Sequence, residues 1–368
     1  MNPFRYGCVV QGDHFCPRRL QEEELKRLVE GGQNVMIQGD RRMGKTSLVK
    51  DLAGKLGEIA FIYVDMLGIR SIHDLARKLT AAMAEIDRRR SFLSKLLKFL
   101  AALRPSLTLD PSGGATLSVD VGKTSTIESL ETLMDALGRL GQTRRLCVVL
   151  DEFQDILKLD DATSILAMLR GKIQFHEGVS YIFLGSIRNK MSELFTSSRQ
   201  PFYKSAVILD IGHIDDEDFI PFIQRKFEDT GRHIGTETIL TILKLADRIS
   251  GDVQELCDAL WATTAEGDAI TEENLEPALQ LIFARESKSY TPIMNQLPKI
   301  QMRVLKAVAL FGGHKPTGQE FLNQAGLHNA ASVRKSLVRL VELDVLQIGE
   351  QGDYRFANPF FREWLRRQ

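Results

Sequence analysis

Eight consecutive residues, 39–46, have the types and the spacing of a phosphate-binding loop. They read Gly-Asp-Arg-Arg-Met-Gly-Lys-Thr, which satisfies the pattern G-x-x-x-x-G-K-[ST]. In loops of this kind the Lys45 ammonium group reaches the β- and γ-phosphates, and the Thr46 hydroxyl group binds Mg²⁺. The residues expected to hold the phosphates are Gly39, Asp40, Arg41, Arg42, Met43, Gly44, Lys45, Thr46 and Ser47. The pattern predicts that the chain binds a nucleoside triphosphate.

The segments on either side of this loop fit the same prediction. Residues 34–38 have the apolar character of a short buried strand, and residues 47–53 have the pattern of a helix. This order directs backbone N–H groups at the phosphates and places the positive end of the helix dipole behind them. Gly39 and Gly44 allow backbone angles that a Cβ atom would forbid. A chance glycine turn is the alternative, and the two flanking elements disfavour it.

A second candidate strand ends in two carboxylates. Residues 145–150 form an apolar run without alternation, which is typical of a strand buried on both faces of a parallel sheet. Asp151 is expected to hold Mg²⁺ through water, and Glu152 to polarise the attacking water in phosphoryl transfer. Taken alone, the Asp-Glu pair is equally compatible with a solvated turn. The upstream phosphate loop favours the catalytic interpretation.

Strands and helices alternate through the first part of the chain. Further strands are expected at 58–65, 178–186 and 206–211, with helices over 72–103 and up to residue 195. This alternation predicts an α/β fold with parallel strands joined by right-handed crossovers. Ligands bind such sheets at the carboxyl ends of the strands, where Gly39, Asp151 and Ser186 fall.

Residues 104–122 interrupt this alternation. Apolar and small polar residues alternate around Asp-Pro-Ser-Gly-Gly, which predicts an inserted β-hairpin after an apolar helix at 92–103. We prefer packing of the hairpin against its own domain; contact with a partner or a neighbouring subunit is the alternative, and a membrane-surface role has weaker support. Residues 122–125 imitate a phosphate loop, but Leu117 stands where the first glycine is required, so we interpret them as a decoy.

The second part of the chain has a different organisation. From residue 215 amphipathic helices follow one another at 217–230, 237–249, 253–264 and 272–287. Helices at 300–310, 318–325 and 330–343 then precede two short strands within 345–356, the order of a winged helix-turn-helix. The expected domains are a core at 1–213 that contains the hairpin, a helical lid at 214–290 and a winged helix at 291–368.

The third helix of this last module carries basic residues, namely Arg334, Lys335 and Arg339. From residue 298 onward the chain has 11 Lys and Arg and 6 Asp and Glu, which is a net charge of +5, whereas the formal net charge of the whole chain is zero. This local excess favours contact between the third helix and DNA. A winged helix that packs only against protein is the alternative, since the fold does not determine the function.

Composition sets outer limits on these interpretations. A chain of 368 residues is long enough for two or three domains. Its formal net charge of zero argues against a protein whose whole surface is basic and binds nucleic acid non-specifically. The four cysteines are scattered without a C-x-x-C pair, which is typical of reduced cytosolic proteins and argues against a zinc site or disulfide framework. Neither a signal peptide nor an apolar run of transmembrane length is recognisable, so we expect a cytoplasmic protein.

Five segments together carry a resemblance to a known family. They are Asn2-Pro-Phe with the later Phe15-Cys-Pro-Arg-Arg-Leu-Gln, the loop at 39–47, Leu150-Asp-Glu-Phe-Gln, Gly185-Ser186 with Arg188, and the terminal stretch 354–364. The set resembles the archaeal-type and bacterial ATPases of the STAND class, within the wider AAA+ group and close to the origin-recognition ATPases. The resemblance implies a P-loop core, a helical lid and a C-terminal winged helix, with ATP and Mg²⁺ as ligands.

The resemblance also implies roles for residues outside the loop. Phe15 and Arg18 match the adenine-contacting box, although Pro17 replaces its usual Gly, and Arg19 and Gln21 replace its two acids. Ser186 matches the sensor-1 position at the end of a strand.

Two further roles keep alternatives open. Arg188 or Arg199 matches the place of an arginine finger that reaches a neighbouring subunit, and an ordinary surface arginine is equally compatible. The family often has Gly-His-Pro in the lid, where residues 248–250 here read Arg-Ile-Ser. Either Gln254 or Asp252 is the substitute, or the lid does not read the γ-phosphate at all.

Two functional hypotheses remain. The leading one is an ATP-driven switch with slow hydrolysis, which transmits its state to DNA or to a protein through the winged helix. The alternative is a nucleotide-stabilised adaptor with little turnover, which uses hairpin and winged helix for contact with a protein partner or another copy. Glu152 favours the first, and the missing His-Pro pair favours the second. A GTPase is disfavoured because residues 189–192 lack the final Asp of N-K-x-D.

Overall fold

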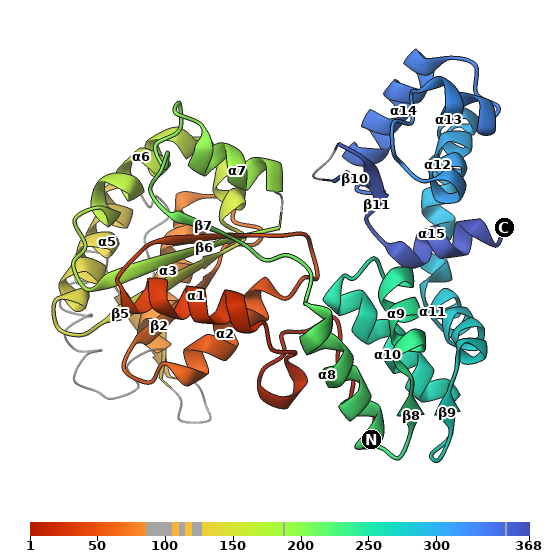
Figure 1. Cartoon of the computed structure of the whole chain (residues 1–368). Helices are drawn as coiled ribbons and strands as arrows, with labels where there is room; N and C mark the ends of the chain where they lie inside the picture. The colour runs from red at the N-terminus through yellow and green to blue at the C-terminus, as the bar shows by residue number, and fades with distance from the viewer. Residues whose placement is uncertain (86–104, 110–114, 120–126, 187, 350–351) are drawn as a thin grey trace. The chain divides into compact units, whose positions relative to one another are not determined.

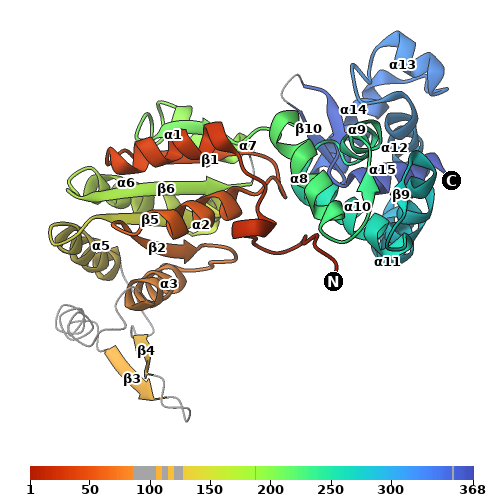
Figure 2. The same cartoon turned by 60° about the horizontal axis from the view of Figure 1, so that its bottom comes forward.

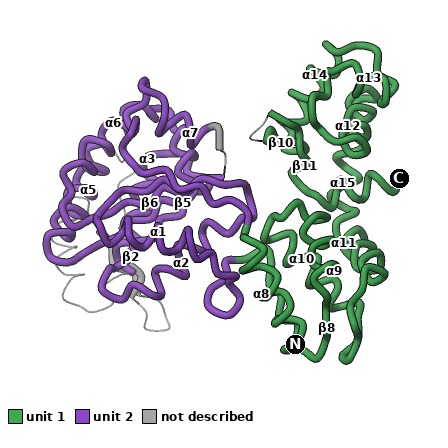
Figure 3. Tube along the Cα trace, viewed as in Figure 1, with its two compact units in different colours: residues 1–8, 214–368 green, residues 9–213 purple. Residues whose placement is uncertain are grey.

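The computed structural model describes residues 1–85, 105–109, 115–119, 127–186, 188–349 and 352–368. Within these ranges the chain forms two compact units (Figure 3). One unit contains residues 9–213, and the other contains residues 1–8 together with residues 214–368. The chain therefore passes between the units twice, after Cys8 and after His213.

The first unit is built on a five-stranded sheet in which every pair of neighbours is parallel (Figure 1). The strand order is β2-β5-β6-β1-β7. The bounds are β1 Val35–Gln38, β2 Ala60–Asp65, β5 Leu146–Asp151, β6 Val179–Gly185 and β7 Val207–Asp210. The parallel α/β fold is confirmed, and β6 lies between the strand that leads into the phosphate loop and the strand that ends in the two acids.

Helices cover both faces of this sheet. Buried side chains of α3 (Ile72–Glu85), α5 (Ile127–Gly141) and α6 (Ala162–Ile173) pack against one face, in a core that includes Met36, Val148 and Phe183. Figure 1 shows α1 (Arg19–Glu30) and α2 (Lys45–Lys55) over the other face. Since successive residues of a strand point to opposite faces, both helical layers bury apolar strand residues.

An aromatic cluster lies directly behind the end of β5. Phe153, Phe183, Phe195 and Phe202 are all at most 2% exposed, and their ring centroids are 4.8 to 6.0 Å apart. Phe195 comes from α7 (Arg188–Thr196), and Phe153 opens a short 3₁₀ helix, Phe153–Lys158. Close-packed rings of this kind fix their backbone segments, so the residues that follow β5 have a rigid support.

The predicted hairpin is present. Strands β3 (Pro105–Leu109) and β4 (Ala115–Val119) pair antiparallel, and Figure 2 shows them beside α3, which β4 contacts. The predicted helix at 92–103 and the decoy at 122–125 lie outside the described residues.

The second unit begins with helices and two very short strands. They are α8 (Asp216–Glu228), β8 (His233–Ile234), α9 (Thr236–Leu245), α10 (Ser250–Thr263), β9 (Ala269–Ile270), a 3₁₀ turn (Glu272–Asn274) and α11 (Leu275–Gln296). The N-terminal segment belongs here: the Asn2 side chain donates to Asp258 at 2.7 Å, and the ring of Phe4 packs against Phe227. Helix α11 runs without a break through residue 290, where the sequence suggests a domain boundary.

The rest of this unit has the order of a winged helix. Three helices, α12 (Lys299–Phe311), α13 (Gln319–Gln324) and α14 (Ala330–Glu342), precede the antiparallel strands β10 (Leu346–Ile348) and β11 (Tyr354–Phe356). A further helix, α15 (Pro359–Arg366), closes the chain; Asn358 caps it, and Pro359 is its first residue. In the described part of the chain, none of the helices has the length and apolar character that crossing a bilayer requires.

Candidate nucleotide site

The phosphate loop connects β1 to α2 as predicted. Gly44, which caps α2, has a φ of 87°, a left-handed value that a glycine adopts without strain. A Cβ atom on Gly39 would lie 2.4 Å from the Ile211 side chain, so only glycine fits there. Lys45 is 7% exposed, and its Nζ donates to the carbonyl oxygens of Gly39 and Asp40, at 2.8 Å each. The ammonium group is thus held inside the curve of the loop.

The end of β5 brings the first acid to the loop. The Thr46 hydroxyl group donates to Asp151 Oδ2 at 2.8 Å, and the Glu152 N–H donates to Asp151 Oδ1 at 2.9 Å. Oxygen ligands of these kinds suit Mg²⁺, which proteins usually bind through one or two carboxylates together with substrate phosphates. Among the described residues, His, Cys, Asp and Glu form no group of three or more that would hold a metal alone. Thr46 and Asp151 therefore fit an ion that is shared with a nucleotide.

Sequence reasoning missed Tyr63, which comes from the adjacent strand β2. Its hydroxyl group also donates to Asp151 Oδ2. Burial, and then the negative charge of Asp151, raise the pKa of this hydroxyl group, so it remains protonated and keeps donating. The register of β2 against β5 pairs Asp65 with Asp151, which places Tyr63 within reach; only the strand pairing reveals this.

The second acid is held in a defined orientation. Glu152 has a φ of 53°, which turns the chain out of β5 and into the 3₁₀ helix. Its Oε2 accepts hydrogen bonds from Ser186 Oγ, at 2.9 Å, and from the Gln154 side-chain amide. Ser186 follows β6, so the strand order explains its contact with Glu152. Gln154 was recognised within the Asp-Glu-Phe-Gln motif, but the sequence assigned it no role.

The two residues matched to the adenine box are buried in the same unit. Phe15 is 8% exposed and Arg18 is 2% exposed. The Arg18 guanidinium group donates to the carbonyl oxygens of Gly212, at 2.6 Å, and Met43, at 2.7 Å. Arg18 therefore touches the phosphate loop itself through Met43.

No described contact joins Arg199 or Gln254 to the loop, and Arg188 is described only by its backbone. Arg188 begins α7, and its side chain lies outside the described part of the chain. Arg199 is exposed, and its N–H donates to Ser197 Oγ at 3.4 Å. Gln254 lies on α10 in the second unit, where its Oε1 accepts from the Arg5 N–H at 3.3 Å. The roles assigned to these three residues stay predictions.

The third helix of the winged helix, α14, presents its basic residues outward. Asn329 caps this helix by accepting from the Ser332 N–H at 3.0 Å. One face buries Val333, Leu337 and Leu340. The opposite, exposed face carries Arg334, Lys335, Val338 and Arg339, and Arg339 is paired with Glu342 at 2.9 Å. The predicted DNA-facing residues therefore share one face, which is mixed rather than uniformly basic.

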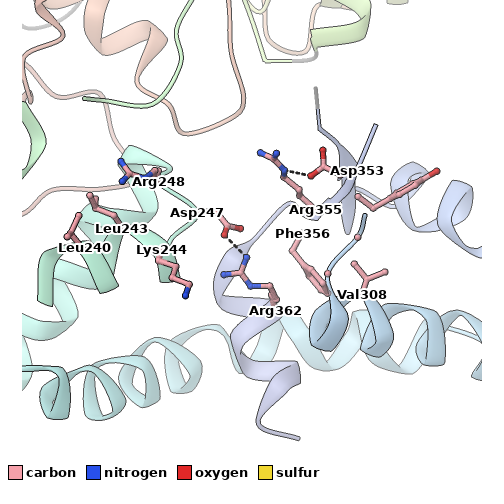
Figure 4. Close-up of a pocket in the computed structure, with 13 residues that line it drawn as sticks. Leu240, Leu243, Lys244, Asp247, Arg248, Val308, Asp353, Arg355, Phe356 and Arg362 are labelled. Carbon is pink, nitrogen blue, oxygen red and sulfur yellow. Dashed lines mark hydrogen bonds and ion pairs between the residues drawn. The ribbon is translucent and has the colours of Figure 1, made fainter. Parts of the chain in front are cut away.

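The second unit also contains a cavity of about 620 Å³, which lies between α9 and the winged-helix elements α12 and β11 with α15 (Figure 4). Its charged lining residues include two ion pairs, Arg362 with Asp247 at 2.5 Å and Arg355 with Asp353 at 2.6 Å. Arg248, at the rim, binds Asp216, and this hydrogen bond lowers the pKa of Asp216. Because its arginines already have carboxylate partners, this cavity is a weaker ligand site than the phosphate loop.

Comparison with known proteins places the fold. A family described as a probable winged helix domain matches residues 288–367. The Walker-type ATPase PABY2304 of Pyrococcus abyssi has a similar structure, with a TM-score of 0.65, 17% sequence identity, and 99% of each chain covered. The ORC2 protein of Aeropyrum pernix in its ADP form gives a TM-score of 0.52 at 13% identity, over 96% of this chain and 97% of that one. No curated protein sequence matches the chain.

These likenesses extend over both compact units. At such low identity they establish the fold, which agrees with the parallel sheet and the phosphate loop described above. The chain has the fold of the Walker-type ATPases and carries a probable winged helix domain at residues 288–367.

Proposed function

We propose that this chain is an ATP-binding and slowly hydrolysing switch of the AAA+/STAND type. The observation that carries the proposal is the convergence of loop and acids: Thr46 binds Asp151, and the neighbouring Glu152 is oriented by Ser186. These groups come from three strands that lie side by side. The Pyrococcus and Aeropyrum proteins support it further, because one is called a Walker-type ATPase and the other was solved with ADP.

Each group has a defined task in this proposal. The loop N–H groups and Lys45 bind the phosphates, and Thr46 with Asp151 holds Mg²⁺, which neutralises charge on the phosphate oxygens. Glu152 accepts the proton of the attacking water, while Ser186 fixes its carboxylate. The protein thus contributes positioning and charge stabilisation, which is most of what phosphoryl transfer requires.

We propose that the winged helix is the part of the chain that contacts the target of the switch. Arg334 and Lys335 on the exposed, mixed face of α14 suit the phosphates and base edges of duplex DNA. The whole module carries the net charge of +5 that the rest of the chain balances. ATP-dependent contact with DNA would then couple the nucleotide state to a target.

The alternative is an adaptor that binds ATP and hardly hydrolyses it. One observation favours it. Arg248 lies in the segment that often carries a γ-phosphate sensor in the resembling family, and both of its Nη atoms donate to the Asp216 carboxylate. The hairpin and the winged helix would then contact a protein partner or a second copy of the chain.

The test is ATP turnover by the purified protein, with and without duplex DNA. A DNA-responsive switch hydrolyses ATP and does so faster when DNA is present. ATP that is bound but not hydrolysed under either condition supports the adaptor. A protein that binds no ATP at all contradicts both.

Reversing two charges on α14 should weaken DNA binding. In the double variant Arg334→Glu and Lys335→Glu, two cations become anions, so repulsion from the DNA backbone replaces attraction. We expect a loss of affinity of about tenfold or more at low salt, and a smaller dependence of affinity on salt.

The matched control is Lys299→Glu with Lys306→Glu on α12, which changes the net charge of the module equally. Fluorescence anisotropy with a labelled duplex at several salt concentrations measures both variants. Equal losses in the two variants would mean that only net charge matters. Unchanged affinity in the α14 variant would favour a winged helix that packs against protein.

A further inference from the structure

The two places where the chain passes between the compact units both adjoin the phosphate loop. The chain leaves the second unit after Cys8 and returns to it after His213. On the core side of these crossings, residues 10–12 are bonded to the helix that follows the loop. Ile211 is bonded to the residue before the loop, and Gly212 is joined to the loop by Arg18. All the contacts described below lie inside the core unit.

The first crossing is attached to α2. The Val10 N–H donates to Ser47 Oγ at 3.1 Å, and the Gly12 N–H donates to Asp51 Oδ1 at 2.9 Å. The Gln11 side-chain amide donates to the Lys50 carbonyl oxygen at 2.7 Å. Ser47 and Asp51 are 5% and 7% exposed, so water competes little for these bonds. Residues 10–12 therefore follow any movement of the first two turns of α2.

The second crossing is attached to the loop itself. The Ile211 N–H donates to the Gln38 carbonyl oxygen at 2.9 Å, and Ile211 packs so closely on Gly39 that no Cβ atom fits there. Arg18 then bridges the two segments, because one of its nitrogens donates to the Gly212 carbonyl oxygen and another to the Met43 carbonyl oxygen. Met43 lies in the middle of the phosphate loop, and Gly212 lies one residue before the crossing.

A guanidinium group is planar and rigid, and Arg18 is 2% exposed. Any rotation of the loop N–H groups toward bound phosphates would also rotate the neighbouring carbonyl groups, because each peptide unit is planar. A change at the Met43 carbonyl group therefore reaches the Gly212 carbonyl group through a single side chain. Arg18 therefore joins the predicted ligand-binding loop directly to the segment before the second crossing.

We propose that Arg18 and Ser47 are positioning residues that transmit nucleotide occupancy of the phosphate loop to the two crossings between the compact units. The inference rests on the proposed binding of ATP. It names the side chains through which ATP binding would change the arrangement of one unit relative to the other. It requires that ATP favour one arrangement of the units over another, because a ligand shifts an equilibrium only by its differential affinity.

Spin labels in each unit test the inference on the full chain. Labels go on Glu177→Cys in the core and Glu273→Cys in the second unit, two exposed positions, with exposed Cys8 replaced by Ser. Cys16, Cys147 and Cys257 are buried, and burial raises the pKa of Cys147 to about 12, so these thiols react poorly. The distance distribution is measured with and without ATP and Mg²⁺, with each protein at saturation by its own binding curve.

Arg18→Lys keeps the charge but cannot reach both carbonyl oxygens in the same planar geometry. We expect ATP to change the distance distribution in the wild type and to leave it unchanged in Arg18→Lys. The matched control is Arg232→Lys, because Arg232 is also buried, at 6% exposed, and donates to Thr230 and Thr264 carbonyl oxygens within the second unit. This control should respond to ATP as the wild type does.

If Arg18→Lys fails to fold, Ser47→Ala is a second test, since it removes the acceptor of the Val10 N–H. Ser47 also belongs to the set expected to hold the phosphates, so its response is compared at saturation with ATP, where we expect it to be reduced. A full ATP response in both Arg18→Lys and Ser47→Ala would overturn the inference. So would a wild type that binds ATP without any change in the distance distribution. A wild type that binds no ATP contradicts the proposed function itself, and its binding curve shows this before any distance is measured.

Discussion

Glu152→Gln should bind ATP and hydrolyse it about 10²- to 10⁴-fold more slowly than the wild type, the usual contribution of a positioned general base. The amide has nearly the same size as the carboxylate but cannot accept the proton of the attacking water. Because Glu152 does not contact the phosphate loop in the structure, binding of the nucleotide should persist. Steady-state phosphate release measures the turnover, and equilibrium binding of a fluorescent ATP analogue measures the affinity.

Asp155→Asn is the matched control for this prediction. Asp155 is another buried carboxylate, only three residues away, but it accepts from the Gly68 N–H at 2.9 Å and pairs with Lys158 at 2.8 Å. Its replacement should lower stability and change turnover little. If Glu152→Gln kept the wild-type rate, Glu152 would not be the base, and the adaptor hypothesis would gain support.

The orientation of Glu152 shows which part of the site the sequence could predict. The loop and both acids were predictable because their spacing and the apolar runs before them are local features. The position of Ser186 beside Glu152 depends on β6 lying between β1 and β5, and that order is a matter of non-local pairing. The resemblance to a known family supplied Ser186 where periodicity alone placed it only at the end of a strand.

Side chains that act through backbone carbonyl groups were harder to predict. Arg18 was matched to an adenine-contacting box, and the structure shows its guanidinium group bonded to Met43 and Gly212. In the sequence, Tyr63 is an ordinary strand residue. Its contact with Asp151 follows from the register of β2 and β5. Both contacts join residues far apart in the sequence, so no local pattern encodes them.

Helix ends differ from the sequence prediction for identifiable reasons. The second lid helix was predicted to reach residue 249, but α9 ends at Leu245 because Asp247 and Arg248 adopt left-handed backbone angles, with φ of 49° and 56°. Their side chains bind Arg362 and Asp216, respectively, and these distant partners support the turn. Helix α15 was not predicted as a helix, although Asn358 and Pro359 are favourable starting residues.

Lys45→Ala should weaken ATP binding by about 30-fold to several thousand-fold, the range that corresponds to the 2–5 kcal/mol typical of truncating one member of a buried charge pair. The Lys45 ammonium group is held within the curve of the loop by the Gly39 and Asp40 carbonyl oxygens. Its replacement removes the positive charge that the loop is expected to place against the β- and γ-phosphates. Isothermal titration calorimetry with ATP and Mg²⁺ measures the loss. Lys55→Ala, at the far end of α2, removes the same charge from the same helix and should bind ATP nearly as the wild type does.

Thermal unfolding separates loss of the ligand contact from damage to the loop. Without nucleotide, Lys45 donates to the Gly39 and Asp40 carbonyl oxygens, so Lys45→Ala should lower Tm slightly even when no ATP is present. With ATP at about 100 times its Kd, binding stabilises the wild type by about 2.7 kcal/mol, which raises its Tm, whereas the variant at the same concentration should gain little. A variant whose Tm rises with ATP as much as that of the wild type would contradict the assignment of residues 39–46 as the phosphate loop, because a phosphate site that works without its lysine must lie elsewhere.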